Sequence, residues 1–180
     1  MAEQYVILVN ENDDPMGVME KMEAHLHAKL HRAFSVFLFN NKAEMLLQQR
    51  AFSKYHSPGL WSNACCSHPQ PGEETQTAAE RRTKEELGID VQLEKQFHLI
   101  YKARFDNGLT EYEFDHVFTG NFNDEPIVNP DEVYDYSFQS LEEIKHSLET
   151  APQNFTAWFK IIFPEIEKWW MKNFIPATGE

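Results

Sequence analysis

Short apolar runs separated by polar turns dominate the first half of the chain, and this pattern is typical of β-strands. Residues 5–9 predict a first strand, and residues 13–17 predict the turn that follows it. Residues 33–40 predict a buried strand, and residues 45–48 predict its return strand. Residues 57–72, which carry proline and glycine near their start, predict an irregular loop.

The second half of the chain begins with a strand pattern and then changes to helix. Residues 97–105 and 110–118 predict two strands, because the Asp-Asn-Gly turn at residues 106–108 is a strong hairpin signal. Residues 133–138 predict a further short strand, and residues 141–148 predict a helix.

The last helical stretch covers residues 155–174, and we expect Pro164 to interrupt it because proline removes a helix hydrogen bond. Together these elements predict an α/β (α+β) fold in one compact domain over residues 1–180. In this fold mixed β-sheets are flanked by helices, and an aromatic helix comes last.

One predicted helix, residues 74–87 with its stop at Gly88, carries few apolar side chains. A helix packed on a core normally shows a wide apolar stripe. Either this helix is solvated and held by ion pairs, or its charges face a metal ion or a phosphate. Its pairs at i,i+4 spacing are Arg81/Glu85 and Arg82/Glu86.

Charge and apolar content exclude several classes of partner. The chain has 16 Lys and Arg against 29 Asp and Glu, so its formal net charge is -13. Phosphate backbones require clustered cations, so we expect no nucleic-acid partner. No apolar run approaches the roughly 20 residues that span a bilayer. No basic segment followed by an apolar run opens the sequence, so we expect no signal peptide. We therefore expect no membrane association and a cytoplasmic location.

Histidines and glutamates supply a candidate site for a divalent ion. Glu111 and Glu113 alternate along a predicted strand, so their side chains leave the same face. Imidazole and carboxylate ligands together suit Zn²⁺ or Mn²⁺. The alternative is that these residues form the wet face of a sheet and that the histidine pairs arise by chance. The candidate ligands are His25, His31, His68, Glu111 and Glu113.

The two adjacent cysteines lie in residues 61–73, the segment whose residue types most strongly indicate chemistry. Cys65 is expected to be a small buried apolar side chain. Cys66 lies two residues before His68, so it is either the nucleophile of a Cys–His pair or a thiol that transfers a proton. The residues alone leave both possibilities open.

Four cations could bind a diphosphate, with Glu86 free to hold Mg²⁺ against it, because Mg²⁺ commonly combines a carboxylate with substrate phosphates. The alternative for each of them is an ordinary surface charge. The aromatic residues Trp61, Tyr101 and Trp158 are either core side chains or an electron-rich wall around a cationic intermediate. The four cations are Lys21, Arg50, Lys54 and Arg82.

Taken together, these residues resemble the type 1 isopentenyl-diphosphate isomerases. The similarity runs in order, with compatible spacing, from about residue 4 to about residue 160. The matching pieces are residues 19–21, His25, residues 30–35, residues 50–54, residues 61–73, Arg81 and Arg82, residues 85–88, and residues 111–113.

The same region is similar to a degenerate Nudix box. Ser67 stands where that pattern begins with glycine, and Arg82 stands where it has the first glutamate of an Arg-Glu pair. The loss of this carboxylate removes a metal ligand that a Nudix hydrolase would use, which favours the isomerase. The pattern falls on Ser67, Glu73, Arg81, Arg82, Thr83, Glu85, Glu86, Gly88 and Ile89.

The resemblance implies a Nudix-like fold and the conversion of isopentenyl diphosphate to dimethylallyl diphosphate through a tertiary carbocation. It implies that Cys66 and Glu113 are the opposed acid and base, with Tyr101 and Trp158 beside the reacting carbons. It implies one Mn²⁺ or Zn²⁺ at the His/Glu site and Mg²⁺ at Glu86. The residues implied to bind the prenyl diphosphate are Lys21, Arg50, Lys54, Ser67 and Arg82.

Two other functions stay open at this point. One is a Nudix-type diphosphate hydrolase, and the other is a non-catalytic domain in which metal serves folding alone. We expect the protein to be a monomer or a weak dimer with a small-molecule substrate.

Overall fold

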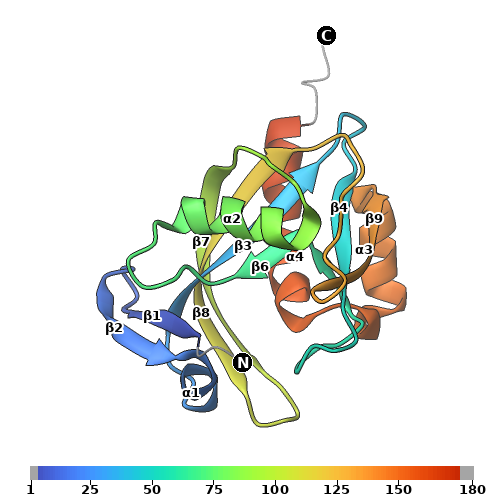
Figure 1. Cartoon of the computed structure of the whole chain (residues 1–180). Helices are drawn as coiled ribbons and strands as arrows, with labels where there is room; N and C mark the ends of the chain where they lie inside the picture. Colours follow the sequence, from blue (N-terminus) through green and yellow to red (C-terminus); the bar gives the residue numbers. More distant parts are fainter. Residues whose placement is uncertain (1–3, 175–180) are drawn as a thin grey trace.

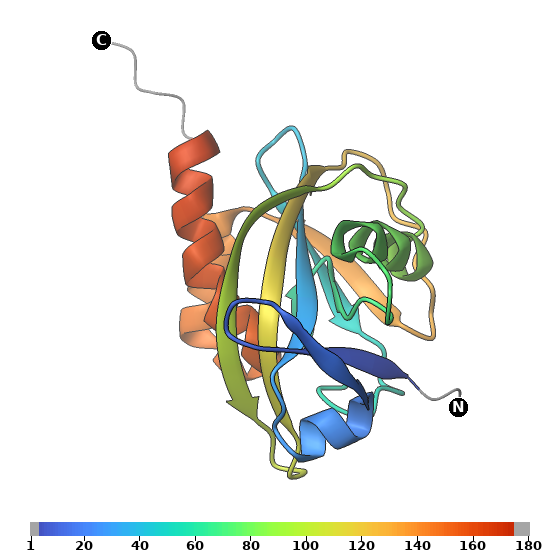
Figure 2. The same ribbon diagram turned by 90° about the vertical axis from the view of Figure 1, so that its left-hand side faces the viewer.

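The computed structural model describes residues 4–174 and contains a strongly curved sheet with helices on both faces (Figure 1, Figure 2). Its strands are β1 (Tyr5–Val9), β2 (Pro15–Glu20), β3 (His31–Phe39), β4 (Met45–Arg50), β5 (Trp61–Asn63), β6 (Cys65–Ser67), β7 (Glu94–Arg104), β8 (Thr110–Asn121) and β9 (Val133–Gln139). Its helices are α1 (Lys21–Leu26), α2 (Thr75–Leu87), α3 (Leu141–Thr150), a 3₁₀ turn (Pro152–Asn154) and α4 (Ala157–Phe174).

All nine strands belong to one mixed sheet. Five of them form its main path, in the order β2-β1-β3-β4-β5. Two branches extend it, because β6 pairs with β3 and β9 pairs with β4. The long hairpin of β7 and β8 attaches through a parallel pairing of β8 with β3, while the other pairings between these nine strands are antiparallel. The mixed α/β architecture expected from the sequence is confirmed.

Each face of the sheet carries its own apolar core. On one face Phe34, Val36 and Leu38 of β3 pack against Ala78 and Ala79 of α2 in the same buried cluster. The alternate residues of β3 lie on the opposite face, which α3 and α4 cover (Figure 2). The sheet is therefore the middle layer between α2 and the C-terminal helices.

Helix α2 forms as the sequence indicates, and small side chains let it lie close to the sheet. Glu74 caps its first turn by accepting a hydrogen bond from the Thr77 amide at 2.9 Å. Gly88 ends it in the left-handed conformation, with φ of 67°. Ala78 and Ala79 are fully buried although they are small, so the helix needs no wide stripe of large apolar residues.

Short strands and a short helix were missed in two places. The predicted turn at residues 13–17 is wrong in its second part, because Pro15 and Gly17 belong to the edge strand β2 and α1 follows directly. Proline is tolerated as the first residue of an edge strand, since it has no ladder hydrogen bond to lose there. The predicted loop of residues 57–72 contains β5 and β6.

The predicted interruption at Pro164 is also wrong, because α4 continues through this proline. Phe159, Phe163 and Ile166 are buried against the sheet on either side of it. This burial stabilises the helix enough to tolerate one missing hydrogen bond. Within residues 4–174, no helix is both long and apolar enough to cross a membrane.

Candidate active site

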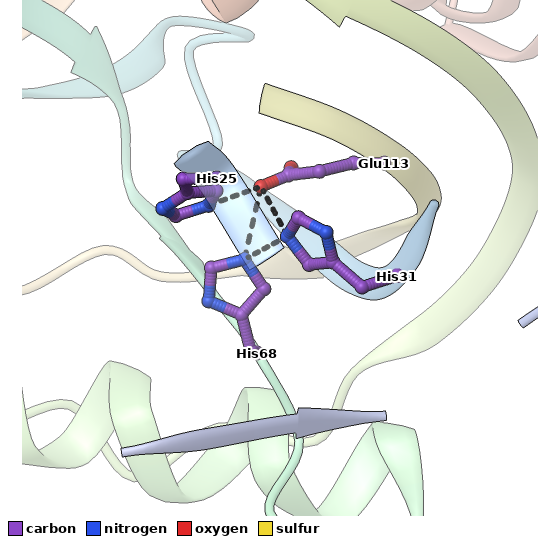
Figure 3. Close-up of side chains that lie close together, drawn as sticks. All are labelled: His25, His31, His68 and Glu113. Carbon is purple, nitrogen blue, oxygen red and sulfur yellow. Dashed lines mark hydrogen bonds and ion pairs between the residues drawn. The ribbon is translucent and has the colours of Figure 1, made fainter. Parts of the chain in front are cut away.

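Four side chains that can ligate metal, from four separate elements, meet beside the start of β3 (Figure 3). Their ligand atoms all lie within 4.8 Å of one another. His25 comes from α1, His31 opens β3, His68 follows β6 and Glu113 lies in β8. His31 pairs directly with Glu113 in the β3–β8 register. Ala28, with φ of 49°, lies in the turn that returns the chain from α1 to β3.

The three imidazoles point their Nε2 atoms at one carboxylate oxygen. Oε1 of Glu113 lies 2.9 Å from Nε2 of His68, 3.4 Å from that of His31 and 4.0 Å from that of His25. Nδ1 of His31 donates a hydrogen bond to the Lys29 carbonyl at 2.8 Å, so the Nε2 of a neutral His31 carries a lone pair. This Nε2 lies 3.2 Å from Nε2 of His68. Such convergence of acceptor atoms is what a metal ion requires.

The protonation state of these imidazoles suits the binding of a divalent cation. Burial, followed by the neighbouring imidazoles His68 and His31, lowers the pKa of His25 to about 3. Burial also lowers the pKa of His68 to about 4. Both rings are therefore neutral ligands at neutral pH. Nε2 of His25 is buried without a hydrogen-bond partner, and among the described residues no Lys or Arg forms an ion pair with Glu113.

Glu113 has a second partner on the other side of its carboxylate. Its Oε2 accepts a hydrogen bond from the Tyr101 hydroxyl at 2.6 Å, and the same hydroxyl lies 3.4 Å from Glu111. Burial alone would raise the pKa of Glu113, but the imidazoles of His68 and His31 hold it well below its usual range. Burial and the charge of Glu113 raise the pKa of Glu111 well above its usual range. The neighbouring carboxyl groups thus differ strongly in proton affinity, with the higher pKa on Glu111 and the lower pKa on Glu113.

Glu111 lies outside the group of four ligands, although it leaves the same strand face as Glu113. Its nearest partners are the Tyr101 hydroxyl and Nε2 of His56, which is 3.8 Å from its Oε1. Its role as a metal ligand therefore stays a prediction.

The two cysteines of β6 face opposite sides of the sheet, because strand side chains alternate. Cys65 is fully buried in the core under α2. Cys66 packs against the core on the other face, which also carries Glu113. Its Sγ donates a hydrogen bond to Oδ1 of Asn63 at 3.0 Å and lies 3.3 Å from Oγ of Ser35. The thiol is therefore held in one position.

The environment of Cys66 keeps it protonated. Burial, followed by the nearby carboxyl of Asp115, raises the pKa of the Cys66 thiol well above its usual range. The amide of Asn63 donates its own hydrogen bonds to the carbonyls of Val36 and Cys65, and this leaves its oxygen facing the thiol. A thiol in this state keeps its proton and is a poor nucleophile.

Aromatic rings lie beside Arg50 and, through His56, beside Glu111. Trp158 is buried, and its indole N–H donates to Ser62 at 2.8 Å. The guanidinium of Arg50 lies 5.2 Å from the centre of this indole. His56 packs edge-on against Trp158 and stacks on Phe105. Trp61, the third aromatic candidate, is partly buried against the same core.

The other candidate cations already interact with charged side chains of the protein. Lys21 is close enough to Lys54 for their charges to interact, and burial with this repulsion lowers the pKa of Lys21. Arg82 on α2 is bonded to Glu86 at 2.7 Å. Glu132, just before β9, pairs with both Lys54 and Arg82.

Glu86 on α2, the predicted Mg²⁺ ligand, is buried. Its carboxylate accepts hydrogen bonds from Arg82 at 2.7 Å and from Gln48 at 2.9 Å. Ser67, the last residue of β6, is partly buried and pairs with Phe34 of β3.

Sequence reasoning missed several polar residues at this site. Asp115 continues the alternation of Glu111 and Glu113 along β8, and that signal was available in the sequence. It is buried, and neither of its carboxylate oxygens has a hydrogen-bond partner. No comparable signal marked His56 or Glu132, because the fold brings them in from loops.

The fold matches that of Nudix proteins. The model of the NUDIX domain family matches residues 29–159. The crystal structure of DR0079 from Deinococcus radiodurans aligns with a TM-score of 0.75 at 18% identity, covering 90% of this chain and 98% of that one. The MutT protein from Methanosarcina mazei Go1 aligns with a TM-score of 0.62 at 22% identity, covering 78% and 94% of the two chains.

The sequence relatives are more specific. An isopentenyl-diphosphate Delta-isomerase from Pectobacterium atrosepticum is 53% identical over 165 residues, which cover 92% of each chain. Isopentenyl-diphosphate Delta-isomerase 2 from Photorhabdus laumondii is 46% identical and covers 93% of this chain and 97% of its own. A third relative, from Aromatoleum aromaticum, is 47% identical over 156 residues. This chain is a member of the isopentenyl-diphosphate Delta-isomerase family and contains a NUDIX domain.

Proposed function

We propose that this protein isomerises isopentenyl diphosphate to dimethylallyl diphosphate by adding a proton at one carbon and removing one from another. The observation that carries the mechanism is that the partly buried thiol of Cys66 and the buried carboxylate of Glu113 lie on one face of the sheet, the first with a raised pKa and the second with a lowered pKa. An unactivated alkene is a weak base, so it requires a positioned acid in a site without water.

Cys66 is the proposed acid. Its thiol is fixed by Asn63 and Ser35, and its raised pKa means that it carries its proton when the substrate binds. The alkene CH₂ group becomes CH₃, and positive charge develops on the tertiary carbon. The indole of Trp158 and the ring of Tyr101 are proposed to stabilise that charge, which is worth up to about 2 kcal/mol for a desolvated cation over an aromatic face.

Glu113 is the proposed base that removes the proton from the neighbouring carbon. One of its oxygens faces the three imidazoles, and the other accepts the Tyr101 hydrogen bond. The carboxylate is therefore oriented from both sides, and Tyr101 can follow its change of charge by shifting one hydrogen bond.

His25, His31, His68 and Glu113 are proposed to hold one Mn²⁺ or Zn²⁺, with Glu111 nearby as a further oxygen donor. A bound divalent ion would lower the proton affinity of Glu113 and fix the imidazoles. The neutral rings and the unpartnered Nε2 of His25 support this assignment.

The diphosphate is proposed to bind to Lys21, Arg50, Lys54, Ser67 and Arg82, with Mg²⁺ at Glu86. Two of these cations retain buried donors without partners, namely Nε of Arg50 and Nε of Arg82. A phosphate oxygen would satisfy such donors by charge-assisted hydrogen bonds. Local cations thus offset the net charge of -13 at this one place.

Hydrolysis of a diphosphate is the alternative, and Arg82 argues against it. This guanidinium is bonded to Glu85 and Glu86, the carboxylates that a hydrolase would use for metal. A cation at this position is suited to holding a diphosphate intact.

The test is incubation of the protein with isopentenyl diphosphate and Mg²⁺, with separate assays for the isomer and for released orthophosphate. We expect dimethylallyl diphosphate and no orthophosphate. Orthophosphate release that disappears when Glu85 and Glu86 are changed to Gln would instead establish the hydrolase. Full loss of activity on chelation with no loss of structure would count against a metal that serves folding alone.

We also propose a cytoplasmic setting, a small-molecule partner rather than nucleic acid or membrane, and a monomer or weak dimer. Both cysteines are free, which suits a reducing compartment.

A further inference from the structure

Glu132 occupies a junction between three segments that carry the diphosphate-binding cations. The backbone carbonyl of Glu132 accepts a hydrogen bond from the Ala51 amide at 3.0 Å, beside Arg50 at the end of β4. The preceding segment is tied to the end of α2, because the Asn129 amide donates to the Glu86 carbonyl at 2.8 Å. Glu132 therefore has a fixed backbone.

Its side chain joins two cations from different elements. One carboxylate oxygen accepts from Nζ of Lys54, and the other lies 3.3 Å from a terminal nitrogen of Arg82. The three side chains are only 21–23% exposed, so water screens these pairs weakly. Burial raises the pKa of Glu132, but the hydrogen bonds and charges of Lys54 and Arg82 lower it by more. The carboxylate is therefore ionised at neutral pH.

Lys54 depends on Glu132 for its ion pair. Among the described residues, Glu132 is the carboxylate that forms an ion pair with Lys54, whereas Arg82 also bonds Glu85 and Glu86. Lys54 also faces the charge of Lys21, which repels it. A lysine side chain is long and flexible, and its ammonium has three donors. A carboxylate that takes one donor can fix the ammonium and leave two for a ligand.

We propose that Glu132 is a positioning residue that holds Lys54 and Arg82 in place for the two phosphoryl groups of the substrate. This inference rests on the proposed diphosphate site. The diphosphate keeps its charge while the double bond moves, so groups that act on it bind substrate and transition state about equally. Loss of Glu132 should therefore raise KM and leave kcat nearly unchanged.

The test compares Glu132→Gln with Glu142→Gln, which removes the same charge from an exposed position on α3. Gln has the same shape but presents no charge to Lys54. We expect Glu132→Gln to raise KM for isopentenyl diphosphate about tenfold, which corresponds to the loss of one partly buried charged contact, about 1.4 kcal/mol. We expect kcat within about twofold of the parent and no change in Glu142→Gln. An unchanged or lower KM in Glu132→Gln would overturn the proposal.

A double-mutant cycle with Lys54→Met separates positioning from a general effect on the fold. If Glu132 acts mainly through Lys54, Glu132→Gln should add less than about threefold to KM in the Lys54→Met background. A full tenfold addition there would mean that Glu132 does not act through Lys54. If Lys54→Met alone leaves KM unchanged, the assignment of Lys54 to the diphosphate site fails, and the role of Glu132 fails with it. Thermal unfolding of each variant confirms that the fold is intact.

Discussion

Two clusters of titratable side chains lie on opposite faces of the paired strands β3 and β8. On the face covered by α4, His31 and Glu113 join two more imidazoles, and among the described residues no cation pairs with them. On the opposite face, Arg32 donates to Asp13 at 2.7 Å, and Nε2 of His116 lies 2.9 Å from the same carboxylate. The residues of the two clusters are neighbours along the strands.

The difference between these clusters shows how to distinguish a structural ion-pair cluster from a ligand site. The second cluster contains its own cation, so Arg32 balances Asp13 and ties the β1–β2 turn to the sheet. The first cluster brings together four atoms that can ligate metal, and its proposed cation comes from outside the protein. The types of residue in the two clusters are similar. The presence or absence of an internal guanidinium is what separates them.

The largest effect is expected from Glu113→Gln, which removes the proposed base and one metal ligand together. Turnover should fall on the order of 10⁴-fold, the upper range for loss of a general base. The matched change on the other face, Asp13→Asn, should leave turnover within about threefold. Initial rates with isopentenyl diphosphate measure both. If the two variants lose activity equally, the two faces do not differ in function.

The adjacent cysteines give a second comparison between the faces. Cys66→Ala should lower turnover about 10³-fold without unfolding the protein, because it removes the acid. Cys65→Ala should keep turnover and lose about 1 kcal/mol of stability, since it leaves a small cavity under α2. Rates and denaturant unfolding of both variants measure this. Full activity in Cys66→Ala would rule out its proposed role.

Removal of metal should lower the stability of the protein through the first cluster alone, the one formed by the three imidazoles and Glu113. A site saturated about 1,000-fold above its Kd adds about 4 kcal/mol to the free energy of unfolding. Chelation should therefore lower the thermal midpoint of the parent protein and of Asp13→Asn by similar amounts. It should have little effect on His25→Ala, which lacks one ligand. A midpoint in the parent that does not respond to chelation would contradict the metal assignment.

The free energy of unfolding of the metal-free protein should depend on pH through the buried imidazoles. The pKa values of His25 and His68 are lowered to about 3 and about 4, chiefly by burial, whereas the unfolded chain protonates them near 6.5. The unfolded state thus binds more protons below pH 6.5, so stability is full above this pH and falls toward pH 4. His68→Gln should make this fall shallower by up to about 1.4 kcal/mol per pH unit. An unchanged slope would mean that His68 does not titrate as a buried ring.

The smallest effect is expected from the second cluster, in which Arg32 balances Asp13, and it is an effect on stability. Asp13→Asn leaves the guanidinium of Arg32 without its counter-charge and should cost about 1–3 kcal/mol of stability. Urea unfolding measures it, with Glu142→Gln as the exposed control. A stability equal to that of the control would show that the Arg32 pair contributes nothing.

Much of the fold was predictable because long elements carry long patterns. The apolar run of β3, the alternating glutamates of β8, the hairpin at Gly108 and the stop at Gly88 are each local signals. The elements that were missed, β2, α1, β5 and β6, are only three to six residues long, and their conformation depends on the strands that pair with them. Pro164 was misjudged because packing on the sheet outweighs the lost hydrogen bond.

The residues of the candidate site also separate into those that the fold brings together as the sequence predicts and those that it does not. The residue types predicted His25, His31, His68 and Glu113 as ligands, and the fold brings these four together. It leaves Glu111 in contact with Tyr101 and His56 instead.

The carboxyl of Asp115 beside Cys66 and the bridge from Glu132 to two cations arise from contacts between distant segments. No local sequence pattern encodes such contacts. Reasoning from sequence therefore finds the chemical groups more readily than it finds the residues that position them.

The most direct measurement is the reaction of isopentenyl diphosphate in D₂O, with the product analysed by mass spectrometry at the first turnover. If Cys66 protonates the alkene, its exchangeable thiol proton is replaced by solvent deuterium, and dimethylallyl diphosphate should carry one deuterium in its new methyl group. No labelled product should form with Cys66→Ala or Glu113→Gln. Unlabelled product, or equal labelling by Cys66→Ala, would contradict proton transfer between these two residues.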